Sequence, residues 1–160
     1  MKVAILTISD RAFEGTREDA SGPALAEAVR DRGWEVALME VLPDERGRIA
    51  ERLGGLAGKV DLILTTGGTG LSPKDVTPEA TLDVVERRVP GIPEAMRAEG
   101  LEKTPMAMLS RAEAGVLRGT LIVNLPGSPK GALECLEAVA DALPHAVEVA
   151  QGRGEHGGKG

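Results

Sequence analysis

The chain has 160 residues, a length that fits one globular domain with a substantial core. Hydrophobic residues make up 42% of it and charged residues 28%, a balance that excludes a disordered chain. The formal net charge of −6, together with Phe13 and Trp34 as the only aromatic residues, argues against nucleic acid or an anionic membrane as a partner.

Cysteine content and hydropathy indicate the compartment. Cys135 is the only cysteine, which excludes an internal disulfide and a cysteine-rich metal site. The apolar start at residues 3–8 is too short for a signal peptide, and no apolar run reaches transmembrane length. We therefore expect a cytoplasmic protein without a membrane partner.

Three early segments are expected to form strands. Short, nearly continuous apolar runs predict them over residues 3–8, 35–42 and 61–66. Between the first two, apolar residues at helical spacing predict a helix over residues 21–32, with Ser21 as a plausible N-cap and Gly33 at its C-terminal end.

Two more helices flank the third strand. One face of the first is marked by Ile49, Leu53 and Leu56. The second is predicted to begin at Thr77, because Thr77 offers a capping hydroxyl and Pro78 suits the first helical position. It is expected to stop at Pro90, which cannot continue a helix.

Later elements continue the alternation. Apolar patterning predicts helices over residues 92–100 and 132–143 and a strand over residues 120–125. Residues 104–118 show no assignable pattern, and the glycine-rich residues 152–160 are expected to form a flexible tail. The single domain expected from this layout spans residues 1–151, with no linker and no internal repeat.

Strands that alternate with helices indicate an α/β fold with an open, mostly parallel sheet between helices. Ligands of such sheets bind beyond the carboxyl ends of the strands. Four loops follow predicted strands and carry unusual residues, at positions 9–11, 43–45, 67–75 and 124–130. If the sheet is parallel, all four loops open onto one edge, where we expect the functional site.

The loop Gly67-Gly68-Thr69-Gly70 is the sharpest of these features. Consecutive glycines allow positive φ angles and present successive amides to a concavity that suits phosphate oxygens. A plain strand-to-helix turn is the alternative. The loop matches neither the Walker A pattern nor the dinucleotide-binding Gly-x-Gly-x-x-Gly. The motif that a kinase-like or dehydrogenase function would need is therefore missing.

Asp44 and Asp75 are the candidate catalytic and metal-binding acids, because each follows a strand end by a few residues. Two carboxylates beside a bound triphosphate suit Mg²⁺, which takes one or two carboxylates plus phosphate oxygens. Structural roles are the alternatives: Asp44 can cap the helix that begins near Glu45, and Asp75 can close a turn ahead of Thr77.

The loop after the last strand offers donors for an anion. It contains Asn124, Pro126, the amides of Gly127 and Ser128, and the cation of Lys130. Anion binding fits these groups, and so does an ordinary strand-to-helix turn. Ser9 and Asp10, after the first strand, are open to the same two interpretations.

Several of these segments resemble one known family. The runs TTGGTG at 65–70 and DVTPEAT at 75–81 resemble the signature of the molybdopterin adenylyltransferase (MoaB/Mog) family, which includes the G domain of gephyrin and its plant counterpart. The likeness covers nearly the whole chain, since it begins at residues 8–10 and continues through 109–112, 124–131 and 143–146.

The resemblance implies a three-layer α/β/α sandwich that assembles as a homotrimer. It implies that the chain joins molybdopterin and Mg-ATP into adenylylated molybdopterin during molybdenum-cofactor synthesis, with other proteins of that pathway as possible partners. Asp44 and Asp75 match the family's two essential aspartates. The loops 67–70 and 124–128 would line the nucleotide and pterin pockets, with Ser9 and Asp10 at the rim.

A non-catalytic molybdopterin-binding carrier of the same fold is the main alternative, and an unrelated nucleotide-binding protein is a second one. The run Asp75-Val76-Thr77-Pro78 favours the catalytic branch, because relatives without clear adenylylating activity lack Val-Thr-Pro after this aspartate.

Overall fold

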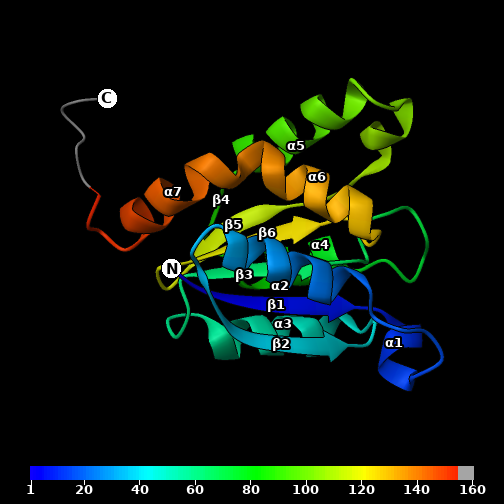
Figure 1. The fold of residues 1–160 in the computed structure, drawn as a ribbon. Helices are drawn as coiled ribbons and strands as arrows, with labels where there is room; N and C mark the ends of the chain where they lie inside the picture. Colours follow the sequence, from blue (N-terminus) through cyan, green and yellow to red (C-terminus); the bar gives the residue numbers. More distant parts are fainter. Residues whose placement is uncertain (155–160) are drawn as a thin grey trace.

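A six-stranded sheet forms the middle of the molecule, with the strand order β2-β1-β3-β6-β5-β4 (Figure 1). The computed structural model describes residues 1–154. The strands are β1 (Lys2–Ile8), β2 (Glu35–Leu42), β3 (Leu62–Thr66), β4 (Arg87–Arg88), β5 (Ala114–Leu117) and β6 (Thr120–Leu125). The strands β2, β1, β3 and β6 run parallel, whereas β5 pairs antiparallel with both β6 and β4.

Helices cover both faces of the sheet. The helices are α1 (Asp10–Glu14), α2 (Ser21–Asp31), α3 (Arg46–Leu56), α4 (Thr77–Val84), α5 (Gly91–Leu101), α6 (Pro129–Val139) and α7 (Leu143–Ala150), with 3-10 turns η1 (Pro105–Leu109) and η2 (Ala140–Ala142). Side chains of α2, α5, α6 and α7 pack on one face, and those of α3 and α4 pack on the other. The predicted three-layer α/β/α sandwich is confirmed.

The strand β1 shows why the apolar runs form central strands. Its residues alternate between the two cores: Val3 and Ile5 contact one, whereas Ala4, Leu6 and Ile8 contact the other. All five are at most 3% exposed, so the strand is covered on both faces. Full burial of each large apolar side chain contributes about 1.5–3 kcal/mol, which fixes the register of this strand in the sheet.

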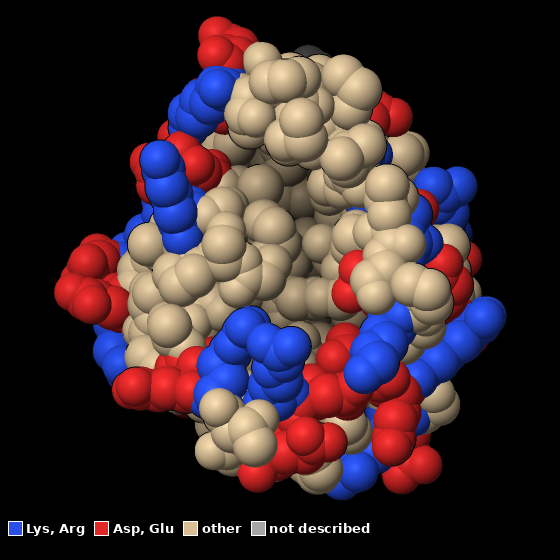
Figure 2. Space-filling model, turned by 90° about the vertical axis from the view of Figure 1, so that its right-hand side faces the viewer, with Lys and Arg blue, Asp and Glu red and all other residues tan. Residues whose placement is uncertain are grey.

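The parallel strands place four loops at one edge. The strands β1, β2, β3 and β6 all end on the same side, so the loops after Ile8, Leu42, Thr66 and Leu125 converge there. Figure 2 views this edge and shows a hollow lined by uncharged residues, with charged side chains gathered below it. The sheet therefore brings together the loops that carry the candidate residues.

Both predicted N-terminal helix caps are wrong, because the two hydroxyls donate to loop carbonyl groups instead. The N-cap of α2 is Ala20, and the hydroxyl of Ser21 donates a hydrogen bond to the carbonyl oxygen of Gly127 (3.0 Å). The helix α4 begins at Thr77 without a side-chain cap, because the hydroxyl of Thr77 donates to the carbonyl oxygen of Gly67 (2.9 Å). Both hydroxyls hold loops at the carboxyl edge of the sheet.

The carboxyl-terminal half differs from the prediction in three places. The helix α4 ends at Val84 rather than at Pro90, and the pattern-free residues 104–118 contain η1 and β5. The helix predicted over 132–143 begins earlier, at Pro129, and ends at Val139 before η2 and α7.

No helix in the described range is long and apolar enough to cross a bilayer.

The end of the described chain folds back on α7. The backbone amides of Arg153 and Gly154 both donate to the carbonyl oxygen of Glu148, at 2.9 and 3.1 Å. The remainder of the predicted tail, residues 155–160, lies outside the described residues.

Candidate active site

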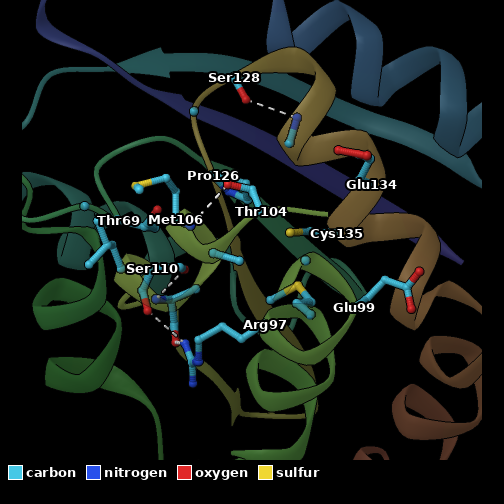
Figure 3. A pocket seen from close by; sticks show the side chains of 18 of the residues that line it. Thr69, Arg97, Glu99, Thr104, Met106, Ser110, Pro126, Ser128, Glu134 and Cys135 are labelled. Carbon is cyan, nitrogen blue, oxygen red and sulfur yellow. Dashed lines mark hydrogen bonds between the residues drawn. The ribbon is translucent and has the colours of Figure 1, made fainter. Parts of the chain in front are cut away.

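Two adjoining cavities open at the carboxyl edge of the sheet. The helix-side cavity, of about 530 Å³, is formed by α5, η1 and α6 together with the loops after β3 and β6 (Figure 3). The strand-side cavity, of about 510 Å³, lies beyond the ends of β1 and β2. Both cavities are lined by Gly68, Asp75, Gly127 and Ser128. Each has the size of a small-molecule site, and the four shared residues form the wall between them.

The glycine loop 67–70 needs its glycines. Gly67 has a φ of 104° and Gly68 a φ of 72°, a region that other residues rarely adopt. A Cβ atom on Gly67 would clash with the carbonyl oxygen of Ile8, and one on Gly68 would clash with the hydroxyl of Thr77. The loop therefore packs closely between the end of β1 and the start of α4.

Three amides of this loop are available to a ligand. The amide of Gly67 is already used, because it donates to the carbonyl oxygen of Leu125 (3.0 Å). The amides of Gly68, Thr69 and Gly70 donate to no partner within residues 1–154, and all three residues line the helix-side cavity. Backbone amides presented in this way suit the oxygens of a phosphate group.

Asp44 is braced at the end of β2 by a reciprocal pair of hydrogen bonds. Its Oδ2 accepts from the amide of Asp10 (3.0 Å), and Oδ1 of Asp10 accepts from the amide of Asp44 (2.8 Å). Burial raises the pKa of the Asp44 carboxyl above its ordinary value, and the charges of Asp10 and Asp75 add to this effect. Asp44 does not cap α3, whose N-cap is Glu45.

Asp75 closes a local turn and also faces the site. Its Oδ2 accepts from the amide of Ser72 (3.1 Å), so the turn proposed for it exists. The same residue lines both cavities, and it shares the strand-side cavity with Asp44. A Cβ atom on Gly70 would approach Oδ2 of Asp75 to 2.9 Å, so a larger residue at position 70 would displace this carboxylate.

The loop after β6 contributes three of its five predicted residues. Pro126, Gly127 and Ser128 line the helix-side cavity, and Oγ of Ser128 caps α6 by accepting from the amide of Gly131 (3.0 Å; Figure 3). Lys130 is exposed and lines neither cavity. The predicted cation therefore lies outside the lining of both cavities.

Asn124 also differs from the expectation. Its side chain is 0% exposed, and its Nδ2 donates to the hydroxyls of Thr65 (3.0 Å) and Thr81 (2.9 Å). Its Oδ1 accepts from the amide of Glu113 (3.0 Å), so three hydrogen bonds occupy this side chain. Asn124 joins β3, α4 and the segment before β5, and it does not line either cavity.

Ser9 and Asp10 lie at the rim in different ways. Ser9 lines the strand-side cavity, and its hydroxyl caps α1 by accepting from the amide of Ala12 (3.2 Å). Asp10 lines neither cavity and instead braces Asp44. Nζ of Lys74 lies 4.0 Å from Oδ2 of Asp10 and so brings a cation to the acidic rim.

Comparisons with known proteins identify the family. A family described as "probable molybdopterin binding domain" matches residues 4–145. The chain belongs to this molybdopterin-binding family. A molybdopterin adenylyltransferase of Helicobacter pylori is 42% identical over 154 residues, which cover 94% of this chain and 88% of the relative. The corresponding protein of Escherichia coli is 41% identical over 92% of this chain and 77% of its own length.

A solved structure shows the same fold. The molybdopterin biosynthesis enzyme MoaB of Thermus thermophilus is 53% identical to this chain, with a TM-score of 0.89. The match covers 94% of this chain and 96% of that protein. The fold of this family member thus agrees with that of a closely similar solved structure.

The residues present fit a magnesium ion that arrives with a nucleotide. No group of three or more His, Cys, Asp or Glu side chains suited to a metal occurs within the described part of the chain. Asp44 and Asp75 each use Oδ2 for a backbone amide, and neither Oδ1 accepts a hydrogen bond from a described residue. Two carboxylate oxygens match a Mg²⁺ ion whose other ligands are phosphate oxygens and water.

Several residues that shape the site of this family member were not among the predicted site residues. The strand-side cavity is also lined by Thr7 of β1, by Arg17 and Asp19 of the loop before α2, and by Ser21 at the start of α2. The side chain of Arg111 donates hydrogen bonds to the glycine loop, to Asp75 and to Glu79, each more than thirty residues away in sequence. No local pattern marks such contacts, because their partners are brought together only by the folded sheet.

Proposed function

We propose that this chain is a molybdopterin adenylyltransferase, which transfers AMP from Mg-ATP to the terminal phosphate of molybdopterin and releases pyrophosphate. The proposal rests on one observation above all: two cavities of small-molecule size share a wall that contains Gly68 and Asp75. Two different reactants can therefore meet at that wall. The adenylyltransferases of H. pylori and E. coli, similar over most of the chain, support this reaction.

The chemistry fits the groups at the shared wall. An oxygen of the pterin's phosphate attacks the α-phosphorus of ATP, and the bond from this phosphorus to the bridging oxygen of pyrophosphate breaks. A phosphate nucleophile is already ionised, so no strong general base is needed. What the site must supply is alignment of two anions and stabilisation of the charge that develops between them.

The chain's own residues provide both effects in this proposal. The amides of Gly68, Thr69 and Gly70 donate to phosphate oxygens, and the absence of a Cβ at the glycines lets the nucleotide approach the backbone. Asp44 and Asp75 would hold Mg²⁺, which supplies charge neutralisation when bound. Burial raises the pKa of Asp44 and the charge of Asp75 adds to this effect, so a bound cation would stabilise the ionised form of Asp44.

The assembly and location follow from the family resemblance. We propose a cytoplasmic homotrimer that receives molybdopterin from another protein of molybdenum-cofactor biosynthesis. Analytical ultracentrifugation tests the oligomeric state: a single species of three times 16.7 kDa supports the trimer, and a monomer refutes it.

One incubation tests the reaction. Purified protein is mixed with molybdopterin, ATP and Mg²⁺, and adenylylated pterin and pyrophosphate are measured. Asp75→Asn is expected to abolish turnover and to leave pterin binding largely intact, because asparagine can still accept from the amide of Ser72 but lacks the charge. Asp83→Asn is the matched control, since Asp83 pairs with Arg46 and lines neither cavity.

Each outcome assigns a function. Adenylylation by the wild type and the control, but not by Asp75→Asn, supports the proposal. Pterin binding without adenylylation would show a carrier instead. No affinity for the pterin would leave an unrelated nucleotide-binding protein and refute the proposal.

A further inference from the structure

Arg111 makes four hydrogen bonds with the glycine loop and the segment that follows it, up to α4. Its backbone amide donates to the carbonyl oxygen of Thr69 (2.9 Å), and its Nε donates to the carbonyl oxygen of Gly70 (2.8 Å). Its Nη2 donates to the carbonyl oxygen of Asp75 (2.9 Å), and its Nη1 donates to Oε2 of Glu79 (2.5 Å). One residue therefore contacts both ends of the segment from Gly70 to Asp75.

The segment between these two ends has few other supports. Residues 71–74 are exposed, and their contacts are the turn closed by Asp75 and the long contact of Lys74 with Asp10. The position of the Asp75 carboxylate thus depends on where its own backbone carbonyl is held. The guanidinium of Arg111 holds that carbonyl at a fixed spacing from the carbonyl of Gly70, because its nitrogens form a rigid planar fork.

Glu79 anchors the guanidinium from the other side. It lies in the first turn of α4, and the ion pair with Arg111 holds the pKa of its carboxyl below the ordinary value. Its Oε1 is buried and accepts no hydrogen bond from any residue in the range 1–154. The carboxylate therefore relies on Arg111, and the pair ties the loop to a helix that packs on the sheet.

Arg111 itself does not contact the reactants, since it lines neither cavity. We propose that Arg111 is a positioning residue for adenylyl transfer, which sets the place of the Asp75 carboxylate and of the loop amides at the wall between the cavities. This inference rests on the function proposed above. Its effect is expected on the reaction step, because a shift of about 1 Å in such a group can slow a reaction about 100-fold.

Two variants and a matched control test the role. Arg111→Met removes the fork and keeps the bulk of the side chain, whereas Arg111→Lys keeps the charge but cannot reach three acceptors at once. Arg52→Met is the control: its side chain is 36% exposed against 34% for Arg111, it also pairs with a glutamate, and it lines neither cavity.

Two kinds of measurement separate positioning from general stability. Steady-state kinetics are expected to show a fall in kcat of about 100-fold for both Arg111 variants, a higher Mg²⁺ requirement, and little change in the KM for molybdopterin. Hydrogen–deuterium exchange is expected to be at least about tenfold faster at the hydrogen-bonded amides of Ser72, Lys74 and Asp75 alone. Arg52→Met should change neither kcat nor exchange at these residues.

Each outcome supports or overturns the positioning role of Arg111. A kcat within twofold of the wild type for Arg111→Met would overturn the positioning role, and so would exchange that rises evenly over the whole chain. If Arg111→Met does not fold, Arg111→Lys is judged by the same measurements. If the wild type itself makes no adenylylated pterin, the proposed reaction fails, and the exchange at these three amides still accepts or rejects Arg111 as the support of the loop.

Discussion

Alanine substitutions at three glycines should separate close packing at the site from ordinary backbone effects. Gly67→Ala places a Cβ against the carbonyl oxygen of Ile8 at a φ of 104°. The unfavourable φ costs about 1–3 kcal/mol, and overpacking against the backbone costs about 1–3 kcal/mol more. The free energy of unfolding should therefore fall by about 2–6 kcal/mol.

Two control glycines lack the close approach. Gly33 also has a positive φ, of 79°, but a Cβ there meets nothing within 4 Å, so Gly33→Ala should cost only about 1–2 kcal/mol. Gly54 lies inside α3 and a Cβ meets nothing within 4 Å, so Gly54→Ala should stabilise the fold by about 0.5–1 kcal/mol.

Urea unfolding followed by far-ultraviolet circular dichroism measures all three variants on one scale. The predicted order of stability is Gly54→Ala above the wild type, then Gly33→Ala, then Gly67→Ala. A Gly67→Ala protein as stable as Gly33→Ala would refute the claim that the glycine loop packs against the end of β1. In that case the loop would be free to move, and its amides would not be preorganised for phosphate.

Three other predictions concern buried polarity, pH and metal. Asn124→Ala should lower the free energy of unfolding by about 2–4 kcal/mol in urea titrations, because it leaves the amide of Glu113 without its acceptor; a loss below about 1 kcal/mol would contradict this. Because the pKa of Asp44 is raised on folding, the stability it contributes is present below its unfolded pKa of about 4 and is lost as pH rises through the folded value. The melting temperature of Asp44→Asn should therefore exceed that of the wild type by more at about pH 7 than at about pH 4. The reverse trend would show that burial is not the main cause of the shift in the pKa of Asp44. Chelation of Mg²⁺ by EDTA should stop adenylylation without changing the melting temperature, whereas a lower melting temperature would indicate a structural metal.

Much of the fold follows from local sequence. The strands β1, β2, β3 and β6 are apolar runs long enough to be recognised, and their parallel order brings the four loops to one edge. The short strands β4 and β5 escaped prediction because a two-residue or four-residue strand has no measurable period. They form because β5 pairs with β6 and β4 pairs with β5. A local sequence pattern does not reveal such pairing.

The candidate site was predicted to the level of loops and less well to the level of side chains. Asp44, Asp75 and the glycines lie where a parallel sheet must place them. Asn124 was predicted as the first residue of the last loop, but it lies within β6, and its side chain donates to two threonines from β3 and α4. A polar residue that binds a ligand and one that satisfies buried partners look the same in sequence, because the partners are far away along the chain.

The most direct test of the site is a crystal structure with Mn²⁺ in place of Mg²⁺ and a non-hydrolysable ATP analogue. Anomalous scattering would then locate the metal. We predict a Mn²⁺ peak within coordination distance of the Asp44 and Asp75 carboxylates, with phosphate oxygens on the amides of Gly68 to Gly70. A metal bound away from both aspartates, or a nucleotide outside the two cavities, would contradict it.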